Sequence, residues 1–438
     1  MPASGWCLAR RIAGDAPGGE LGFRFGEPLD LDGDGNADVA AGARFKLRRE
    51  TYQNGSAAAW AGWSGASAGA TRKLREWDGD LPDGLFGHWV LPVADLGPAG
   101  AAGVVIAAPN ARVNDLPKGV LVARSAVSGE EFWNRSGPGA QAENFGWDLS
   151  PAGDQNGDAR SDLFVGAPSL DGGRVYLLSN KDGALLQTYE PPQQVRSFGW
   201  FVARLGDLDG DGRADLIAGA PFEMDGARAV SGGAHVLSSA SGRQLYHWNG
   251  SGALSGFGEV VAALGDLDGD GKGEIAVAAP RTDDATRALP GEVFIYSGAT
   301  GKELGHWSGK QPGELFGRMV VAAGDLDADG IDDVAIGAPW HRRDKADKAE
   351  KAGRVELRSG RSGAVIAEFF GDQADCWFGW HIRRAPDPEQ LGRPALLIGS
   401  LRHPVDGHAG VGVLDLYVLR RGQLQGTITD GARRSDIR

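Results

Sequence analysis

The sequence predicts an all-β protein, a seven-bladed β-propeller with four antiparallel strands in each blade. Three observations favour this fold class. A unit of about 60 residues recurs along the 438-residue chain, and such a period is typical of closed repeat arrays. Within the unit, a Phe-Gly pair, an acidic loop and a Gly-Ala-Pro ending recur at fixed offsets. The 70 glycines and an aromatic content of only 8% indicate many turns and short strands.

The repeats are located by two signals that keep a constant distance from the acidic loop. The Phe-Gly pair lies nine residues before the first Asp of the loop, and the Gly-Ala-Pro ending begins twelve residues after it. In the first repeat Leu21-Gly22 replaces Phe-Gly, and we discount Phe25-Gly26 because it is out of register. We therefore expect one domain over residues 1–438, with repeats that start near residues 21, 86, 145, 198, 257, 316 and 378.

Each repeat divides into four expected strands. The first follows the Phe-Gly pair and the second runs into Gly-Ala-Pro. The third is of the type seen in residues 173–178, and the fourth resembles residues 242–248. The third and fourth strands meet at small-residue turns such as residues 179–183, which suit hairpins that need a positive φ.

The two ends of the chain compete to close the ring. Residues 7–20 occupy the place that the last strand of each later repeat holds before its Phe-Gly pair, as in residues 303–314. A ring removes its unpaired edge when the first strand of the chain completes the last blade. We therefore expect residues 1–20 to supply the closing strand, with residues 423–438 as the alternative.

Composition excludes several classes of protein. The net charge of −13 arises from the acidic loops, which together hold more acidic side chains than this excess, so a general affinity for nucleic acid is not expected. No run of 18 apolar residues predicts a membrane span, and residues 1–15 lack the apolar core of a secretory signal. Cys7 and Cys376 are expected as two separate buried thiols, with a bridge between them as the alternative.

Five acidic loops carry the ligand pattern of a hard cation. In residues 207–215 the backbone turns at Gly210 and Gly212, which brings alternate side chains toward one point. The acidic residues of this loop are Asp207, Asp209, Asp211 and Asp215. Together with a backbone carbonyl they approach the 6–8 oxygens, roughly, that Ca²⁺ prefers.

Two other interpretations of these loops are open. An EF-hand requires Glu at the twelfth loop position and flanking helices, whereas that position is Ala218 and an apolar strand follows. Solvated acidic turns without metal are the second alternative. They would leave three or four carboxylates close together without compensation in each loop, which is electrostatically unfavourable.

At these motifs the chain resembles the seven FG-GAP repeats that form the N-terminal β-propeller of integrin α chains, over residues 7 to about 426. In that family the loop joins strands one and two on the lower face of a blade and binds structural calcium. The resemblance implies about five Ca²⁺ ions. The implied side-chain ligands are Asp30, Asp32, Asp34 and Asp38; Asp154, Asn156, Asp158 and Asp162; Asp207, Asp209, Asp211 and Asp215; Asp266, Asp268, Asp270 and Glu274; and Asp325, Asp327, Asp329 and Asp333. The implied backbone ligands are the carbonyls of Asn36, Arg160, Arg213, Lys272 and Ile331.

Blades two and seven are expected to bind no ion. Asp95 is the only acidic residue of the corresponding loop in blade two, and the loop that contains Asp387 in blade seven is interrupted by prolines.

The residue just after each Phe-Gly pair forms a second candidate site. In integrin α propellers this position lines the upper mouth of the channel, where aromatic rings cage a basic side chain of the partner subunit. The ligand-binding candidates implied here are Phe23, His88, Trp147, Trp200 and Trp380, with Glu259 and Arg318 at the remaining two positions. The alternative is that the rings only pack the mouth.

The loops between strands two and three should lie on the same upper face. They span residues 43–55, 222–231, 281–290 and 340–354, and they vary in length and charge, as expected where a rigid scaffold carries binding loops.

Signals of catalysis are weak. Residues 65–69 fit GxSxG but fall at an expected hairpin turn, and His247 and His306 occupy equivalent strand positions that indicate repeat packing. No enzymatic activity is therefore expected.

The sequence thus predicts a calcium-stabilised, non-enzymatic adhesion or protein-binding module, extracellular or at the cell surface and monomeric. Its upper face would bind a protein or glycan. The alternatives are a carbohydrate-binding propeller, favoured by Trp147, Trp200, Trp340 and Trp380, and an accessory domain of a polysaccharide-active enzyme.

Overall fold

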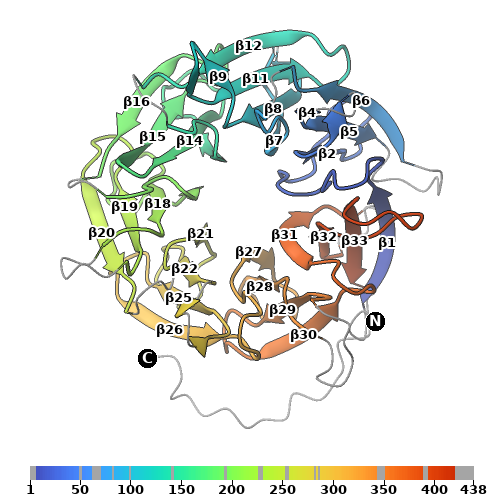
Figure 1. The fold of residues 1–438 in the computed structure, drawn as a ribbon. Helices are drawn as coiled ribbons and strands as arrows, with labels where there is room; N and C mark the ends of the chain where they lie inside the picture. Colours follow the sequence, from blue (N-terminus) through green and yellow to red (C-terminus); the bar gives the residue numbers. More distant parts are fainter. Residues whose placement is uncertain are drawn as a thin grey trace.

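Seven blades surround a central channel in the computed structural model (Figure 1). The structure describes residues 6–419 except 49–51, 62–70, 81–82, 98–99, 140–142, 192–194, 225–229, 252–255, 281–282, 285–286, 343–350 and 388–392. The regular elements of these residues are all strands. The predicted fold class, a seven-bladed propeller of antiparallel sheets, is confirmed.

Six blades are four-stranded antiparallel sheets. Blade two contains β7 (Trp89–Val93), β8 (Gly103–Ala108), β11 (Val120–Ser125) and β12 (Glu131–Ser136). Blade three contains β13 (Asp148–Gly153), β14 (Asp162–Ser169), β15 (Gly172–Leu178) and β16 (Leu185–Tyr189). Blade four contains β17 (Val202–Arg204), β18 (Leu216–Ala220), β19 (Gly233–Leu237) and β20 (Gln244–Asn249).

The last three blades repeat this pattern. Blade five contains β21 (Val260–Ala263), β22 (Ile275–Ala279), β25 (Glu292–Tyr296) and β26 (Glu303–Ser308). Blade six contains β27 (Met319–Gly324), β28 (Asp333–Ala338), β29 (Arg354–Arg358) and β30 (Val365–Phe370). Blade seven contains β31 (Phe378–Ala385), β32 (Ala395–Ser400), β33 (Val413–Leu419) and β1 (Trp6–Ala13).

Blade one has a reduced inner edge. Its continuous strands are β2 (Val39–Ala43), β5 (Ser56–Ala61) and β6 (Arg72–Asp78). The inner position is held by two isolated bridges, Phe25 to Ala41 and Leu29 to Asp38. Gly22 has a φ of 89°, as Gly317 of a Phe-Gly pair has, whereas Gly26 does not adopt a positive φ. The backbone therefore places the first repeat's register at Leu21-Gly22.

Short hairpins extend from the connections between second and third strands in blades one, two and five. They consist of β3 (Leu47–Arg48) with β4 (Tyr52–Gln53), β9 (Arg112–Val113) with β10 (Leu116–Pro117), and β23 (Asp283–Asp284) with β24 (Arg287–Ala288).

The N-terminal strand β1 lies on the outer edge of blade seven (Figure 1). It pairs antiparallel with β33, from Trp6 opposite Leu419 to Ala13 opposite Val413. Arg11 of β1 binds Asp415 of β33 through two contacts, Nε to Oδ1 at 2.6 Å and Nη2 to Oδ2 at 2.8 Å. Because Asp415 is buried, this forked pair fixes the register of the closing strand. The competing residues 423–438 lie outside the described residues.

The Phe-Gly pair of each blade contacts the backbone of the preceding blade. Phe198 forms a parallel bridge with Gly173, the second residue of β15, and Phe257 and Phe378 form the same bridge with Gly232 and Gly353. A Cβ at Gly173 would lie 2.2 Å from the carbonyl oxygen of Phe198. Only glycine admits this approach, so the glycine that begins each third strand is required by blade-to-blade packing.

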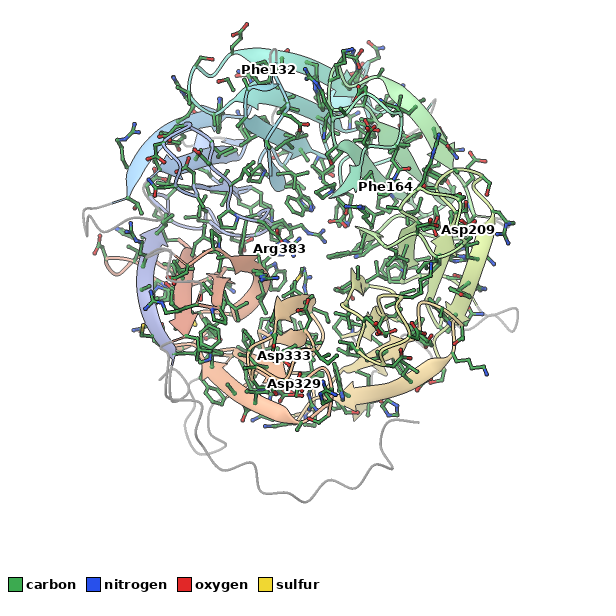
Figure 2. All side chains as sticks on the ribbon, turned by 180° about the vertical axis from the view of Figure 1, so that it is seen from behind. Phe132, Phe164, Asp209, Asp329, Asp333 and Arg383 are labelled. Carbon is green, nitrogen blue, oxygen red and sulfur yellow. The ribbon has the colours of Figure 1, made fainter. Side chains whose placement is uncertain are left out.

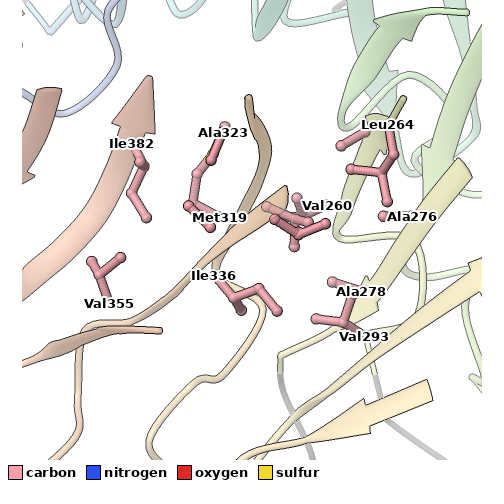
Figure 3. Close-up of a cluster of buried hydrophobic side chains, with 14 of the residues drawn as sticks. Val260, Leu264, Ala276, Ala278, Val293, Met319, Ala323, Ile336, Val355 and Ile382 are labelled. Carbon is pink, nitrogen blue, oxygen red and sulfur yellow. The ribbon is translucent and has the colours of Figure 1, made fainter. Parts of the chain in front are cut away.

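Apolar side chains fill the spaces between neighbouring blades. Figure 3 shows one such cluster, in which Val260 and Val293 of blade five lie near Met319 and Ile336 of blade six. The second strand of blade five, IAVAA, is fully buried. Its small residues let the inner strands converge toward the channel.

Asp148 of blade three contacts the inner edges of blades one, two and four. It forms a buried ion pair with Arg24 of blade one and accepts a hydrogen bond from Trp89 Nε1 of blade two at 2.7 Å. Its other oxygen accepts the backbone N–H of Val202 in blade four, also at 2.7 Å. These donors satisfy a carboxylate that has almost no contact with water.

The two cysteines are not bridged. Cys7 and Cys376 are both free, and the buried Cys376 Sγ donates to the carbonyl of Ala352 at 3.0 Å. Burial raises the pKa of the Cys376 thiol to about 11, so it stays protonated.

Candidate functional site

The five acidic loops join the first and second strands of their blades. In blade four the loop connects Arg204, the last residue of β17, to Leu216, the first residue of β18. Figure 2 shows Asp209, Asp329 and Asp333 on the blades, away from the central channel. The acidic loops of blades four and six therefore have equivalent places on their blades.

The first Asp of each loop organises the turn. Asp207 accepts the backbone N–H groups of Gly210 at 2.7 Å and Gly212 at 2.9 Å, and these glycines have φ values of 82° and 90°. Asp30, Asp154 and Asp266 accept the corresponding backbone N–H groups of their own loops. The turn is thus built by the carboxylate and by residues that tolerate a left-handed backbone.

The last acidic residue of each loop is buried beneath the turn. Asp215 has no exposed surface, and its Oδ2 accepts the backbone N–H of Leu208 at 2.8 Å. The equivalent residues, also without exposed surface, are Asp38, Asp162, Glu274 and Asp333.

Carboxylate oxygens converge in four of the loops, where they lie within 4.8 Å of one another. The converging groups are Asp30, Asp32 and Asp38; Asp207, Asp209 and Asp215; Asp266, Asp268, Asp270 and Glu274; and Asp325, Asp327 and Asp333. The fifth loop has the amide of Asn156 at the second position.

Burial and mutual repulsion change the acidity of the last ligand candidate in every loop. Desolvation, followed by the charges of neighbouring aspartates, raises the pKa to about 6 for Asp38, Asp162, Asp215 and Asp333. The same causes raise the pKa of Glu274 to about 7. The raised pKa thus reflects first the burial of this carboxylate and second the negative charges gathered in the loop.

These loops fit a hard cation. The buried Oδ1 of Asp38 and the buried Oε1 of Glu274 accept no hydrogen bond from the described residues. An unpaired buried carboxylate oxygen is costly, and a bound cation would satisfy it. All side-chain donors of the five loops are oxygens, the ligand type that Ca²⁺ selects over softer metals.

Blades two and seven differ from the other five. Both carboxylate oxygens of Asp387 contact Arg393, at 2.7 Å to Nη2 and 2.9 Å to Nε. In blade two, the carbonyl of Asp95 accepts a hydrogen bond at 3.2 Å from Arg160 of the next loop. In both blades that lack the acidic ligand pattern, an arginine thus contacts the Asp that remains.

Five aromatic residues meet in one row at the channel mouth, which we call the mouth row: Phe23, His88, Trp147, Trp200 and Trp380. The ring centroids are 4.8 Å apart for Trp147 and Trp200, 4.8 Å for His88 and Trp147, 4.9 Å for Phe23 and His88, and 5.9 Å for Phe23 and Trp380. Phe23 and His88 are buried, whereas the three tryptophans are half-buried. The structure therefore brings all five predicted residues together, but two of them are buried and only the three tryptophans are partly accessible.

The mouth row and the acidic loops lie at opposite ends of the first strands. In blade four, Trp200 comes just before β17 and Asp207 comes shortly after it. Because a strand carries its two flanking residues to opposite edges of the sheet, the two candidate sites occupy opposite faces of the ring.

Family comparison matches the same repeats. The FG-GAP repeat matches residues 198–237 and 318–355, and the FG-GAP-like repeat matches residues 266–336. Integrin alpha-V of Gallus gallus is 34% identical over 202 residues, which cover 42% of this chain and 19% of the relative. The chain is an integrin alpha-like FG-GAP propeller.

Other relatives also match less than half of this chain and leave most of their own length unmatched. Integrin alpha-5 of Xenopus laevis is 33% identical over 211 residues, 44% of this propeller and 20% of the relative. Integrin alpha-4 of Xenopus laevis is 33% identical over 196 residues, 40% of the propeller and 18% of the relative. The matched part is thus about a fifth of these integrin chains.

Solved structures support the fold alone. The FG-GAP propeller is similar to the crystal structure of BBS1N in complex with ARL6DN soaked with lead, with a TM-score of 0.57 and 12% identity. That match covers 96% of this chain and 98% of the other. The mercury-soaked crystal gives a TM-score of 0.55 and 13% identity over 96% and 99% of the two chains.

The mouth row of this FG-GAP propeller already carries cations of its own chain. The guanidinium of Arg318 lies 4.1 Å from the centroid of the Trp380 ring, and that of Arg44 lies 3.3 Å from the Phe23 ring. The repeat position of Arg318 predicts its place at the mouth. The sequence position of Arg44 does not predict its contact with the mouth row. Arg44 belongs to the loop after β2, and only the folded chain brings it to the Phe23 ring.

Sequence reasoning also missed Trp377. Its ring stacks on Trp380 with centroids 5.4 Å apart and lies 5.7 Å from the Trp340 ring, so it extends the mouth row toward blade six. An available signal was its position just before Phe378-Gly379, where a tryptophan replaces the residues found in the other repeats.

Three further expectations from the sequence concern the GxSxG match, His306 and membrane spans. Residues 65–69, the GxSxG match, lie outside the described residues. His306 lies opposite Phe294 in blade five, with ring centroids 5.4 Å apart. Of the residues described, none belongs to a helix that is long and apolar enough to span a membrane.

Proposed function

We propose that this FG-GAP propeller is a calcium-stabilised, non-enzymatic module for adhesion or protein recognition that acts outside the cell or at its surface. The observation that carries the proposal is the mouth row, in which rings from five blades are in continuous contact and three half-buried tryptophans are partly accessible. Half-buried tryptophans on a rigid scaffold are typical of binding surfaces, because they bury much area with little loss of conformational freedom.

The acidic loops support the calcium part of the proposal. Four of them bring three or more carboxylates together, and all five bury their last carboxylate beneath the turn. Calcium at these loops would remove the repulsion between carboxylates and hold the first and second strands of each blade in register. The loops lie on the face opposite the mouth row, so we propose that calcium supports the scaffold and does not contact the ligand.

The resemblance to integrin α chains supports protein recognition over other roles. It covers less than half of this chain, so the partner and the cellular role remain part of the proposal. The loops after the second strands lie at the same end of the blades as the mouth row and would extend the contact surface.

The test compares binding with and without the three half-buried tryptophan rings. The triple variant Trp147→Ala, Trp200→Ala and Trp380→Ala should lose the proteins that the wild-type chain captures from native cell surfaces or medium, while its calcium stoichiometry stays unchanged. The matched control is Leu185→Ala, which removes an exposed apolar side chain on the outer strand of blade three.

Two outcomes would contradict the proposal. Undiminished capture by the triple variant would show that the mouth row is not the ligand site. Selective binding of the wild-type chain to a glycan array, lost in the triple variant, would instead assign the mouth row to carbohydrate.

A further inference from the structure

Blade four contains a cluster of Glu223, His235 and His247 that the proposed calcium sites do not use. Glu223 follows the second strand, β18, whereas the acidic loop of the same blade precedes that strand. The cluster therefore lies at the opposite end of blade four from Asp207 and Asp215. It is separate in position and in ligand chemistry from the acidic loops.

The two imidazoles share one carboxylate. His235 Nε2 lies 2.7 Å from Glu223 Oε2, and His247 Nε2 lies 3.0 Å from Glu223 Oε1. The imidazole rings stack with centroids 4.2 Å apart and planes 18° apart, because His235 of β19 is directly opposite His247 of β20. Ligand atoms of all three residues lie within 4.8 Å of one another.

Gln244 contacts the second ring nitrogen of His235. Its side-chain Oε1, which can only accept a hydrogen bond, lies 3.0 Å from His235 Nδ1. A hydrogen on Nδ1 satisfies this acceptor and directs the Nε2 lone pair toward the carboxylate of Glu223, which is the tautomer that a metal ion bound at Nε2 requires.

This arrangement matches the surroundings of metal-bound histidines. A histidine that ligates through one ring nitrogen usually donates the other N–H to an acceptor, which fixes the ring and its tautomer. Gln244 is in that position for His235, and Phe198 packs edge-on against the same ring with centroids 5.5 Å apart. His235 is thus held in one orientation from two sides.

The backbone leaves space for the carboxylate. A Cβ at Gly233 would lie 1.8 Å from Glu223 Oε2, so a side chain there would expel Glu223. Blades three and six carry Arg174 and Arg354 at the equivalent position, the residue after the glycine that bridges to Phe-Gly. Blade four therefore differs from blades three and six in having a glycine, and not an arginine, beside this carboxylate.

We propose that Glu223, His235 and His247 bind a divalent transition metal ion of the zinc class. Two imidazole nitrogens and one carboxylate are a ligand set that zinc uses in proteins, and it is too poor in oxygen to favour Ca²⁺. Tetrahedral zinc at about 2.0–2.2 Å from its ligands needs donors about 3.3 Å apart, so the cluster opens by about half an ångström. The His247 side chain is 27% exposed and gives the ion access from solvent, where water completes the coordination.

The experiment uses the full chain, free of any histidine tag and saturated with Ca²⁺ so that oxygen sites are occupied. Zn²⁺ titration against a chromogenic chelator should show one zinc ion per chain. Co²⁺ in its place should give the visible absorption of a tetrahedral site with nitrogen ligands. His247→Ala and Glu223→Gln should each weaken zinc binding at least about tenfold, and Gln244→Ala should weaken it by about 10- to 100-fold.

The matched control is His306→Ala. His306 occupies the same register in blade five, but it faces Phe294 instead of a second imidazole. Its loss should leave zinc affinity unchanged. Absence of stoichiometric zinc, or equal affinity in wild type, His247→Ala and Glu223→Gln, would overturn the proposal. His247→Ala is decisive if Glu223→Gln does not fold, because His247 is on the outer strand.

Discussion

Asp387 and Arg393 form a forked ion pair at the place in blade seven where five other blades carry an acidic loop. The guanidinium compensates the single carboxylate. An acidic loop instead gathers several carboxylates, and the arginines that contact them are exposed at the rim, as Arg243 is beside Asp209. Both arrangements neutralise a partly buried charge, one with a side chain and one, as we propose, with an ion. The two ways of neutralising charge can be compared by one substitution in an acidic loop and one in blade seven.

Asp211→Ala should remove one calcium ion and lower the melting temperature only when calcium is present. The site would contribute on the order of 2.7 kcal/mol if free calcium exceeds its dissociation constant a hundredfold. Asp387→Ala should leave the calcium count unchanged. It should lower the melting temperature equally with calcium and after its removal, because the forked ion pair with Arg393 is lost. Calcium titration by calorimetry and melting curves measure both effects. Seven ions, or none, would contradict the assignment of five loops.

Calcium stabilisation should decrease as the pH falls from about 8 to about 5. In the metal-free fold the pKa values of Asp38 and Asp215 are raised to about 6, above those of the unfolded chain. The folded state therefore takes up protons first, so the metal-free protein gains stability on acidification and loses it as the pH rises through about 6. The calcium form behaves oppositely, because protons compete with the ion. Melting temperatures of calcium-loaded and dialysed metal-free protein should converge at acidic pH; a constant gap would contradict this.

The closing strand gives a third prediction. Arg11→Ala leaves the buried Asp415 without its forked partner and should destabilise the fold by about 3 kcal/mol. Deleting residues 1–12 should lower the melting temperature further and expose the edge of β33, which favours association. Leu8→Ala is the control, because Leu8 lies on the same strand with 43% of its surface exposed. Light scattering and thermal melting report both effects. A monomeric deletion variant with unchanged melting would assign closure to the C-terminal residues.

The sequence was sufficient for features that repeat. The Phe-Gly pair, the acidic loop and the Gly-Ala-Pro ending recur at fixed offsets, so their positions on a blade follow once one blade is understood. The repeat places Trp147, Trp200 and Trp380 at equivalent positions, and the resemblance to integrin α propellers implies that this position lies at the channel mouth. Residues at equivalent positions of the repeat occupy equivalent places on their blades. The fold and the grouping of the mouth row could be predicted for this reason.

The features that do not repeat could not be predicted. His247 stood out only as a counterpart of His306, because nothing in a single strand shows that it lies opposite His235. That pairing depends on the register of β19 and β20, which shifts at an irregularity between Val236 and Leu237. Glu223 reaches the two imidazoles only because Gly233 leaves space. Such contacts are set by register and volume, which the repeat pattern does not encode.

Blade-to-blade packing gives the last prediction, and two adjacent glycines isolate it. Gly172 and Gly173 begin β15 with nearly the same backbone, at φ values of 147° and 145°. An alanine suffers similar backbone strain at either position. The difference is contact: a Cβ at Gly172 meets nothing within 4 Å, whereas at Gly173 it lies 2.2 Å from the carbonyl oxygen of Phe198 in the next blade.

Gly173→Ala should therefore lower the free energy of unfolding by about 1–3 kcal/mol more than Gly172→Ala does. The excess measures the close approach between blades three and four, since the strain is common to both variants. Urea unfolding in saturating calcium provides the comparison, with calcium stoichiometry as the check that the acidic loops are intact. Equal destabilisation by the two variants would show that backbone strain alone accounts for the glycine, and that the Phe-Gly bridge does not limit the spacing of the blades.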